Sequence, residues 1–539
     1  MIIPDVRDYD ALCAAFSWNL PEKFNMARAI CDDWVAREPN RVALIYKHPD
    51  GKIEEFTYAM LQAQANRLAN LLVGRGIKPG DRVAILLPQC PEAVIAHIAI
   101  YKIGAVALPL AALFGVEALE YRLNNSGAKA LIVFEGCVEK ITEIRDTLSD
   151  LEFVLSIDGN AGIAEDLHRA MEKESPEFMT ADTKLDDAAL MIYTSGTTGP
   201  PKGALHGHRV LIGHLPGVRF AHEFLPQPDD RLWTPSDWAW AGGLLNVLLP
   251  GLFFGVPVVG QRSEKFDPEA AFALMAELKI SNVFIAPTAL KIMRVVENPA
   301  QKYDLTLRTI FSGGEAVGRE LQDWAGKEFD LPINEVFGQT ECNLVLTSCA
   351  EIGVWRKGAI GKPVPGHEVA IVDDQGDELP QGESGNIAIK RPDPVMFLEY
   401  WDQPDATLKK FAGEWLLTGD QGVMDEDGFF FFVGRDDDVI TSAGYRIGPG
   451  EIEDCLLGHE AVKLAAVVGK PDPVRTEIVK AFLVLNAGYQ ESEELSDEIT
   501  QYVRERLSAH EYPREIAFRD SLPLTTTGKV IRRLLREEN

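Results

Sequence analysis

The sequence predicts an α/β fold: a large N-terminal domain of stacked α/β sheets with a small barrel-like unit, followed by a small α+β domain. Three observations lead to this prediction. The chain of 539 residues is too long for one hydrophobic core. Apolar strand-like runs alternate with helical patterns, as in parallel α/β sheets. After about residue 363 the pattern changes to short β segments with Gly, Asp and Glu turns, and the last ~100 residues have the size of one compact domain.

The elements of the large domain follow one another as helix and strand. The first expected helix covers residues 57–76, where apolar residues recur on one face and Gly74 and Gly76 end the pattern. After it, short apolar runs predict buried strands, and one longer run predicts a helix. In chain order these are the strand 83–87, the helix 93–102 and the strands 105–108, 131–134 and 154–157.

The same alternation returns in the second half of the large domain. The pattern predicts a helix over residues 268–278, followed by strands over residues 283–286, 309–311 and 334–337. Small or polar residues follow the last two strands, and open α/β sheets bind their ligands at such strand ends. These two ends are therefore candidate binding positions.

The domain boundary is expected at an acidic run that follows a very apolar strand, residues 429–433. We place it at Asp437, which gives a large domain of residues 1–436 and a small domain of residues 437–539. Ser496 and Asp497 are residues suited to open a helix in the small domain. The expected order there is strand 464–468, strand 481–485, helix 497–507 and strand 515–518.

Charge and composition limit the partners of the chain. Lysine and arginine number 53 against 82 aspartates and glutamates, a formal net charge of −29. Such a chain repels nucleic acid and anionic membranes, so we expect neither as a partner, and an anionic ligand needs a locally positive pocket. Seven scattered cysteines without a Cys-x-x-Cys pair argue against a disulfide framework or a zinc site. With no secretory signal and no apolar run of transmembrane length, the sequence predicts a cytoplasmic protein.

One stretch carries most of the functional signal: residues 193–206, which read YTSGTTGPPKGALH. Glycines allow close backbone approach, and successive N–H groups in such a turn form an anion-binding concavity. The hydroxyl groups add donors and the lysine adds a point charge. The residues expected to hold a polyphosphate are Thr194, Ser195, Gly196, Thr197, Thr198, Gly199 and Lys202.

The spacing differs from that of the common phosphate loop, which runs straight into a helix. Here Pro200 and Pro201 precede the lysine and disfavour a helix start. Short clusters of this composition are also typical of surface turns. The whole string resembles the phosphate loop of the adenylate-forming superfamily, which includes acyl-CoA synthetases, luciferases and adenylation domains of peptide synthetases. With the motifs below, the resemblance extends over roughly residues 40–535.

Two strand ends match further motifs of that superfamily, the turn 312–316 (SGGEA) and the run 337–341 (FGQTE). The resemblance implies that the turn lines the adenine and that Thr340 touches the α-phosphate as a catalytic residue. It also implies that Glu341 binds Mg²⁺, which prefers one or two carboxylates together with phosphate oxygens. The ATP contacts implied here are Gly314, Glu315, Ala316, Glu335, Val336, Phe337, Gly338, Gln339 and Thr340.

Two later motifs complete the nucleotide site. Asp420, in WLLTGD, is implied to accept hydrogen bonds from the ribose hydroxyls, with Arg435 beside the nucleotide. Lys529, in TTGKV, is implied to be the catalytic lysine, because an ammonium group relieves the repulsion between a carboxylate and the α-phosphate. In the superfamily the small domain is mobile and turns about a hinge at the position of Asp437. The lysine is then present for one step and absent for the next.

The segment 437–449 and two short strings after it are similar to those of medium-chain acyl-CoA synthetases. In those relatives Arg446 lies near the phosphate and the carboxylate as a catalytic residue. Coenzyme A carries phosphates that require basic partners, although surface solvation is the alternative for two of the arginines. The implied contacts with coenzyme A are Ser442, Ala443, Gly444, Tyr445, Arg475, Tyr512, Pro513 and Arg514.

The acyl pocket is expected around residues 237–243 (DWAWAGG), where relatives line an acyl tunnel. Trp240 would form a wall, Ala241 would line the tunnel and Gly242 would leave room, although core packing is the alternative for the tryptophan. In the acetate-specific branch a tryptophan blocks the pocket just before Gln-Thr-Glu, and Gly338 at that position removes the plug. Each buried methylene adds about 0.8 kcal/mol, so we expect a short- to medium-chain or small aryl acid.

The sequence therefore predicts an ATP-dependent acyl-CoA synthetase that uses Mg²⁺ and coenzyme A and acts on a small carboxylic acid, as a monomer or a homodimer. Two alternatives stay open at this point. One is an adenylation enzyme that loads a carrier protein, and the other is a nucleotide-binding protein without catalysis. The joint presence of every phosphate-binding and catalytic residue speaks against the second alternative, because drift usually removes at least one.

Overall fold

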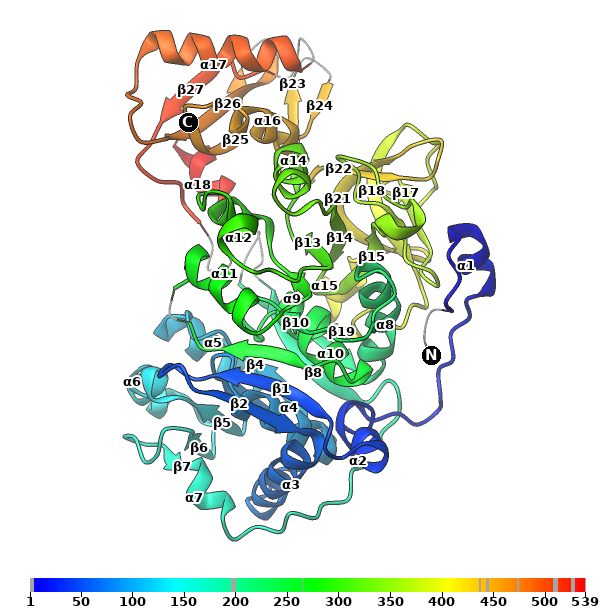
Figure 1. Ribbon diagram of the computed structural model, residues 1–539, viewed down its shortest axis with the longest axis vertical. Coiled ribbons are helices and arrows are strands. Elements are labelled where there is room, and N and C mark those ends of the chain that lie inside the picture. Colours follow the sequence, from blue (N-terminus) through cyan, green and yellow to red (C-terminus); the bar gives the residue numbers. More distant parts are fainter. Residues whose placement is uncertain are drawn as a thin grey trace.

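The computed structural model describes the chain except for residues 1–3, 195–199, 264, 436–437, 443–444, 473–474, 508–511, 525–528 and 539. The described residues form four sheets with helices packed around them (Figure 1). Strands alternate with helices through the two large sheets, so the predicted α/β class is confirmed. Within the described residues, none of the helices combines the length and the apolar composition that crossing a bilayer requires.

An eight-stranded sheet carries the hairpin that flanks the phosphate loop. Its inner strands are parallel, whereas β8 and β9 run antiparallel with Thr194 opposite Lys202. Helices α3 (Tyr58–Gly74), α4 (Pro91–Ile103), α5 (Val116–Ser126) and α6 (Glu135–Ile144) belong to this region. The strand order is β19 (Glu399–Tyr400), β9 (Lys202–Gly207), β8 (Ala188–Thr194), β4 (Val106–Pro109), β3 (Arg82–Leu86), β5 (Ala130–Val133), β6 (Phe153–Ser156) and β7 (Glu165–Asp166).

A nine-stranded sheet carries the two strand ends that the sequence marks as binding positions, those of β13 and β14. Around it lie α8 (Arg209–Ala221), α11 (Pro268–Glu277), α12 (Pro287–Met293) and α14 (Gly318–Phe329). The strand order is β16 (Lys362–Pro363), β15 (Cys342–Thr347), β14 (Ile333–Gln339), β13 (Thr309–Gly313), β12 (Asn282–Phe284), β10 (Leu232–Trp233), β11 (Val258–Gln261), β1 (Val42–Lys47) and β2 (Ile53–Thr57).

The unit expected to be barrel-like is a five-stranded antiparallel sheet. It places Asp420 on β21 directly opposite Arg435 on β22. Its strands are β17 (Val369–Val372), β18 (Ser384–Lys390), β21 (Trp415–Met424), β20 (Phe411–Ala412) and β22 (Phe430–Arg435).

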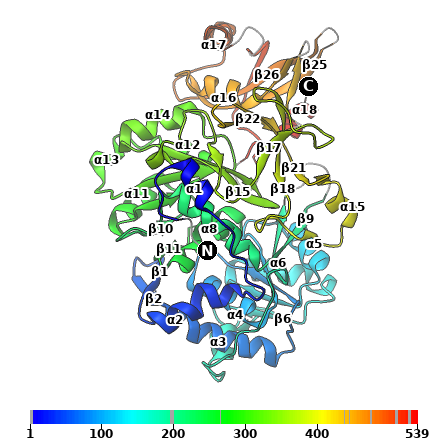
Figure 2. The ribbon, with the colours of Figure 1, turned by 90° about the vertical axis from the view of Figure 1, so that its right-hand side faces the viewer.

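The fourth sheet lies at one end of the molecule, next to α14, in both views (Figures 1 and 2). Its strands are β24 (Tyr445–Ile447), β23 (Ile440–Ser442), β26 (Thr476–Leu485), β25 (Val462–Asp472) and β27 (Glu515–Phe518), and its helices are α16 (Pro449–Leu457), α17 (Glu493–Arg506) and α18 (Arg532–Glu537). The sequence prediction omitted α16 and the β23–β24 hairpin. It also opened α17 too late, since the capping side chain is that of Ser492, which accepts a hydrogen bond from the amide of Leu495.

One hydrophobic core joins the two large sheets. It contains residues of β1 and β11 from one sheet and of β3, β4, β5 and β8 from the other. Helix α4 is buried along almost its whole length, as expected for a helix between two layers. Short helical segments complete the fold: α1 (Tyr9–Ala15), α2 (Asp33–Arg37), α7 (Leu167–Met171), α9 (Ala241–Gly243), α10 (Leu249–Phe254), α13 (Pro299–Lys302), α15 (Pro404–Leu408) and the π-helical turns Arg28–Asp32 and Leu244–Leu248.

Candidate active site

The phosphate loop connects β8 to β9. Thr194 and Lys202 face each other at its base, and the hydroxyl of Thr194 donates to the carbonyl oxygen of Lys202 over 3.5 Å. The ammonium group of Lys202 lies 5.1 Å from the ring centre of Tyr400. Residues 195–199, expected to form the anion-binding turn, lie outside the described residues. The two prolines led us to expect no helix start here, and β9 follows Pro201.

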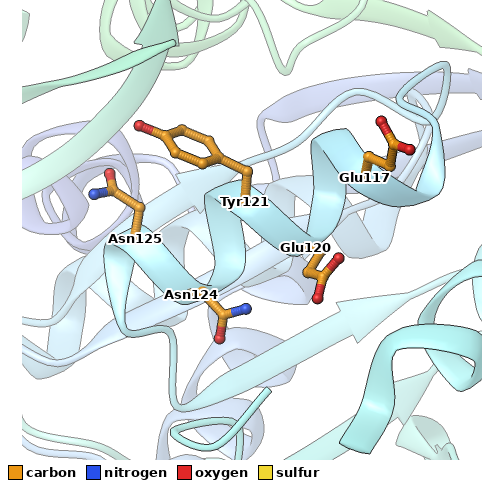
Figure 3. Close-up of a pocket in the computed structure, with 5 residues that line it drawn as sticks. All are labelled: Glu117, Glu120, Tyr121, Asn124 and Asn125. Atoms are coloured by element: carbon orange, nitrogen blue, oxygen red, sulfur yellow. The ribbon is translucent and has the colours of Figure 1, made fainter. Parts of the chain in front are cut away.

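Helix α5 supports both ends of this loop. The hydroxyl of Tyr193 donates to the side-chain oxygen of Asn125 (2.6 Å), and the hydroxyl of Tyr121 donates to the carbonyl of Pro201 (3.0 Å). Figure 3 shows Tyr121 and Asn125 along α5. With three more α5 residues they line an open cavity of ≈ 560 Å³: Glu117, Glu120 and Asn124. The sequence did not single out α5 as a support of the loop.

The turn after β13 has an exposed Gly314, and a lysine from the C-terminal end of the chain reaches it. The ammonium nitrogen of Lys529 lies 4.0 Å from the position that a Cβ on Gly314 would occupy. The carboxylate of Glu315 accepts hydrogen bonds from the hydroxyl of Thr288 at 3.0 and 3.2 Å, and Ala316 is exposed beside it. This turn and Lys529, far apart in sequence, are therefore brought together.

Glu335 supports this turn from inside the protein. Its carboxyl group is buried and accepts a hydrogen bond from the amide of Val317 (3.2 Å). Burial raises the pKa of Glu335 to about 8, and the charge of Asp454 adds to this effect. We expected Glu335 among the ATP contacts, but its side chain faces the protein interior. Val336 is likewise buried, against Gly313.

Gln339 belongs to a hydrogen-bonded group at the end of β14. Its amide nitrogen donates to the carbonyl of Thr418 (3.0 Å) and approaches a carboxylate oxygen of Asp420 (3.5 Å). Its amide oxygen accepts from the ammonium group of Lys410 (2.8 Å). Phe337, on the same strand, is partly buried against the core cluster that contains Tyr400. No motif pointed to Lys410, because a pair of lysines before a strand is an ordinary surface pattern.

Glu341 is buried, and the hydroxyl of Tyr400 donates to one of its carboxylate oxygens. Burial and the charge of Glu341 raise the pKa of Tyr400 far above its usual range, so this hydroxyl remains a donor. Tyr400 lies on β19 of the eight-stranded sheet and Glu341 lies between β14 and β15, and no sequence pattern indicated their contact. Thr340 is partly exposed between Gln339 and Glu341.

Asp420 and Arg435 lie opposite each other on β21 and β22, with 4.0 Å between Nε and Oδ1. Burial raises the pKa of Asp420 to about 6, while Arg435, Lys410 and Lys529 each lower it. The ends of β13 and β14 and the β21–β22 pair, which belong to two sheets, thus surround one region that Lys529 enters.

The expected acyl-pocket residues lie beside a group of aromatic rings. Trp240 packs edge-on against Phe114, with 5.6 Å between ring centres, and Ala241 begins the short helix α9. A Cβ on Gly242 would lie 2.6 Å from the ring of Phe284. Trp240 is partly buried and packs against the hydrophobic core that joins the two large sheets.

Our interpretation of Gly338 as an unplugged position needs correction. A Cβ on Gly338 would lie 2.6 Å from the Cα of Asn343 and closer still to the amide of Leu344. Real Cβ atoms do not approach backbone atoms so closely, so a side chain at residue 338 would require the β14–β15 hairpin to shift. The absent side chain points at the backbone of β15 and not into open space.

The residues implied for coenzyme A lie in the C-terminal part of the chain. Ser442 is buried at the end of β23, Arg475 precedes β26 and donates its amide to Asp472 (2.8 Å), and Pro513 is buried before β27. The guanidinium group of Arg514 lies 4.9 Å from the ring centre of Tyr512. Ala443, Gly444 and the hinge candidate Asp437 fall outside the described residues, and only the backbone of Tyr445 and Arg446 is described, in β24.

The C-terminal part contacts the nine-stranded sheet through α14. This helix has no capping side chain of its own at its N-terminus. Instead, Asp454 of α16 accepts a hydrogen bond from the amide of Arg319 (2.9 Å). At the other end of α16, a Cβ on Gly458 would lie 3.1 Å from the carboxylate of Glu320. These contacts accompany the arrangement in which Lys529 lies beside Gly314.

Comparison with known proteins gives matches over the whole site. The family profile described as AMP-binding enzyme matches residues 31–401, and that of the AMP-binding enzyme C-terminal domain matches residues 451–529. The acetyl-coenzyme A synthetase of Bacillus subtilis (strain 168) is 38% identical over 510 residues, covering 92% of this chain and 87% of that protein. The mitochondrial acyl-coenzyme A synthetase ACSM3 of Rattus norvegicus is 32% identical over 546 residues, covering 98% and 93%. The crystal structure of the anthranilate CoA ligase AuaEII with anthranoyl-AMP has a TM-score of 0.89 at 29% identity, covering 96% of this chain and 98% of that chain.

Proposed function

The chain belongs to the family of AMP-binding enzymes, and we propose that it is an ATP-dependent acyl-CoA synthetase that works through an acyl-adenylate. The observation that carries this proposal is the position of Lys529. Its ammonium nitrogen lies 4.0 Å from the Cβ position of Gly314, and its charge acts on Asp420. A cation from the C-terminal part therefore faces two of the positions at which the motifs place ATP.

In the first half-reaction an oxygen of the substrate carboxylate attacks the α-phosphorus of ATP, and pyrophosphate leaves. Because both reacting groups are anions, the step needs cations placed where charge develops. We assign this task to Lys529, with Lys202 on the departing phosphates. Thr340 would hold the α-phosphate, and Asp420 would accept hydrogen bonds from the ribose hydroxyls. We assign Arg446 as a second cation near the α-phosphate, and this assignment rests only on the family resemblance.

The residues present fit a magnesium ion bound together with ATP. Mg²⁺ is usually held by one or two carboxylates plus phosphate oxygens. Glu341 offers a buried carboxylate, one oxygen of which already accepts from Tyr400. Within the described part of the chain no three metal-binding side chains gather, so the phosphates would supply most of the ligands. When bound, the ion would neutralise phosphate charge and leave the residues of this chain to orient the nucleotide.

For the second half-reaction we propose that residues 437–539 rotate about Asp437 relative to residues 1–436. The rotation withdraws Lys529 and presents the residues implied for coenzyme A. The thiol then attacks the acyl carbon of the mixed anhydride, and AMP leaves. The arginines at 475 and 514 support this assignment, because the phosphates of coenzyme A require cations on an otherwise acidic protein.

As substrate we propose a short- to medium-chain or small aryl carboxylic acid. The names of the relatives, which act on acetate, on acyl groups and on anthranilate, support a small acid. So do the apolar rings of Trp240, Phe114 and Phe284 beside Gly242. All seven cysteines are free, which supports a reducing compartment such as the cytoplasm.

The test is a pyrophosphate-release screen over straight-chain acids from acetate to decanoate, with benzoate and branched acids, with and without coenzyme A. We expect release with a subset of small acids and thioester product only when coenzyme A is present. Acyl transfer to a carrier protein but not to coenzyme A would replace this function with carrier loading. No pyrophosphate release with any acid would overturn the proposal.

A further inference from the structure

Lys410 is a partly buried cation at the nucleotide site that none of the motifs includes. It lies just before β20, and its ammonium group donates to the amide oxygen of Gln339 (2.8 Å) and to the carbonyls of Thr418 (3.2 Å) and Leu417 (3.3 Å). The three donors of a lysine are thus matched by three acceptors. A side chain held in this way keeps one position.

Lys410 determines the orientation of the side-chain amide of Gln339. An ammonium group only donates, so Gln339 has to present its oxygen to Lys410. The amide nitrogen then points the other way, to the carbonyl of Thr418 (3.0 Å) and to a carboxylate oxygen of Asp420 (3.5 Å). Thr418 in turn accepts from both Lys410 and Gln339, which closes the group.

We propose that Lys410 is a positioning residue for ATP: through Gln339 it holds Asp420 in the orientation in which the carboxylate receives the ribose hydroxyls. The inference rests on the proposed function, since it takes the ribose as the partner of Asp420. Lys410 acts through another side chain and does not touch the reacting atoms. Its loss should therefore affect the recognition of ribose more than the chemical step.

The charges around Asp420 support the same role. The groups that face it are Arg435 of β22, Lys410, Lys529 and Glu341. Burial raises the pKa of Asp420 to about 6, the three cations lower it and Glu341 raises it. Lys410 itself faces Glu341 and Asp420 as well as two other cations, Arg435 and Lys202. Without Lys410, the pKa of Asp420 rises, and the carboxylate accepts hydrogen bonds only at higher pH.

The experiment compares ATP with 2′,3′-dideoxy-ATP in acyl-adenylate formation by the full chain. In the unchanged protein the ratio of kcat/KM for the two nucleotides measures the ribose contact. Lys410→Met should reduce kcat/KM for ATP about tenfold, the size of one charge-assisted hydrogen bond, mainly through KM. It should leave the dideoxy nucleotide nearly unaffected, so the ratio falls by the same factor. The acid limb of the pH profile with ATP should also move to higher pH.

Two variants make the result decisive. Lys409→Met removes the neighbouring, exposed lysine and should leave both nucleotides unaffected. Lys410→Arg keeps a donating cation and should retain most of the ratio. Equal losses with ATP and the dideoxy nucleotide in Lys410→Met would show a merely structural role and overturn the inference. Normal selectivity for ATP in that variant would overturn it too, whereas an unchanged protein that forms no acyl-adenylate would instead refute the proposed function.

Discussion

Replacing Asp454 with alanine is expected to slow acyl-adenylate formation while leaving thioester formation largely intact. Asp454 lies on α16 in the C-terminal part, yet it accepts a hydrogen bond from the amide of Arg319 in the first turn of α14 (2.9 Å). It thereby caps a helix that has no capping side chain of its own. The cap occurs in the same structure in which Lys529 lies beside Gly314. Its free energy therefore stabilises the arrangement with the lysine at the nucleotide site.

The magnitude follows from the geometry of the cap. Replacing a capping side chain by alanine costs about 1 kcal/mol, within a range of 0.5–2 kcal/mol. A carboxylate at a helix N-terminus also interacts favourably with the helix dipole, an effect that salt screens. Here the cost falls only on the arrangement in which the C-terminal part is docked against α14, because the helix and its cap belong to different parts of the chain. A loss of about 1 kcal/mol changes the ratio of docked to undocked molecules roughly fivefold.

The assay separates the two half-reactions. ATP–pyrophosphate exchange in the presence of acid reports the first, and thioester formation from supplied acyl-adenylate reports the second. We expect Asp454→Ala to reduce exchange by up to about fivefold and to leave the second rate unchanged or higher. Asp497→Ala, which removes an exposed carboxylate from α17 of the same part, is the control. An equal fall in both half-reactions, or none in exchange, would refute the role of the cap.

Four further changes test the site. Lys529→Ala should reduce acyl-adenylate formation by roughly 10²–10³-fold, and thioester formation from supplied acyl-adenylate should survive; equal losses in stopped-flow traces of both steps would contradict its assignment. Tyr400→Phe removes the donor to Glu341 and should raise the KM for MgATP about tenfold, which a titration of ATP at fixed Mg²⁺ measures. Glu335→Gln should make thermal stability less pH-dependent. Because the pKa of Glu335 is about 8, the folded protein keeps a proton that the unfolded chain loses, so the unchanged protein loses stability as pH rises from about 4.5 to 8. Parallel plots of melting temperature against pH for the two proteins would disprove this. Phe284→Leu should shift the preferred acid by one or more carbons in the pyrophosphate-release screen, and an unaltered chain-length profile would exclude Phe284 from the pocket.

Local sequence patterns were sufficient to predict a helix or strand whose own residues determine its structure. The strands expected over residues 83–87 and 309–311 are β3 and β13, and each is a short buried run bounded by turn residues. Helix α17 shows where such patterns become ambiguous. Ser492 and Ser496 are both suitable caps, and burial of Leu495 against the sheet extends the helix to the earlier one. Packing across the domain, which sequence spacing does not report, decides between them.

The same limit applies to the active site. Sequence motifs identified Glu341, Gln339 and Asp420, because each lies in a short string whose residue types indicate its role. The residues that hold them, Tyr400 and Lys410, lie 59 and 71 positions from their partners in the chain. Nothing in their own neighbourhoods distinguishes them from an ordinary tyrosine and a surface lysine. Their roles become evident only when β19 of the eight-stranded sheet and the segment before β20 fold against the β14–β15 hairpin.

The acyl pocket shows why a glycine in a motif is an incomplete guide to space. Removing a side chain opens room only in the direction in which the Cβ would have pointed. At Gly338 that direction leads to the backbone of β15, which cannot yield, whereas at Gly242 it leads to the ring of Phe284, a side chain that can turn aside. A larger residue at 338 would therefore disturb the hairpin that carries Gln339 and Glu341 before it shortened any pocket. We therefore expect the length of the acid to depend on Phe284 and Trp240, and not on the residue in front of Gln339.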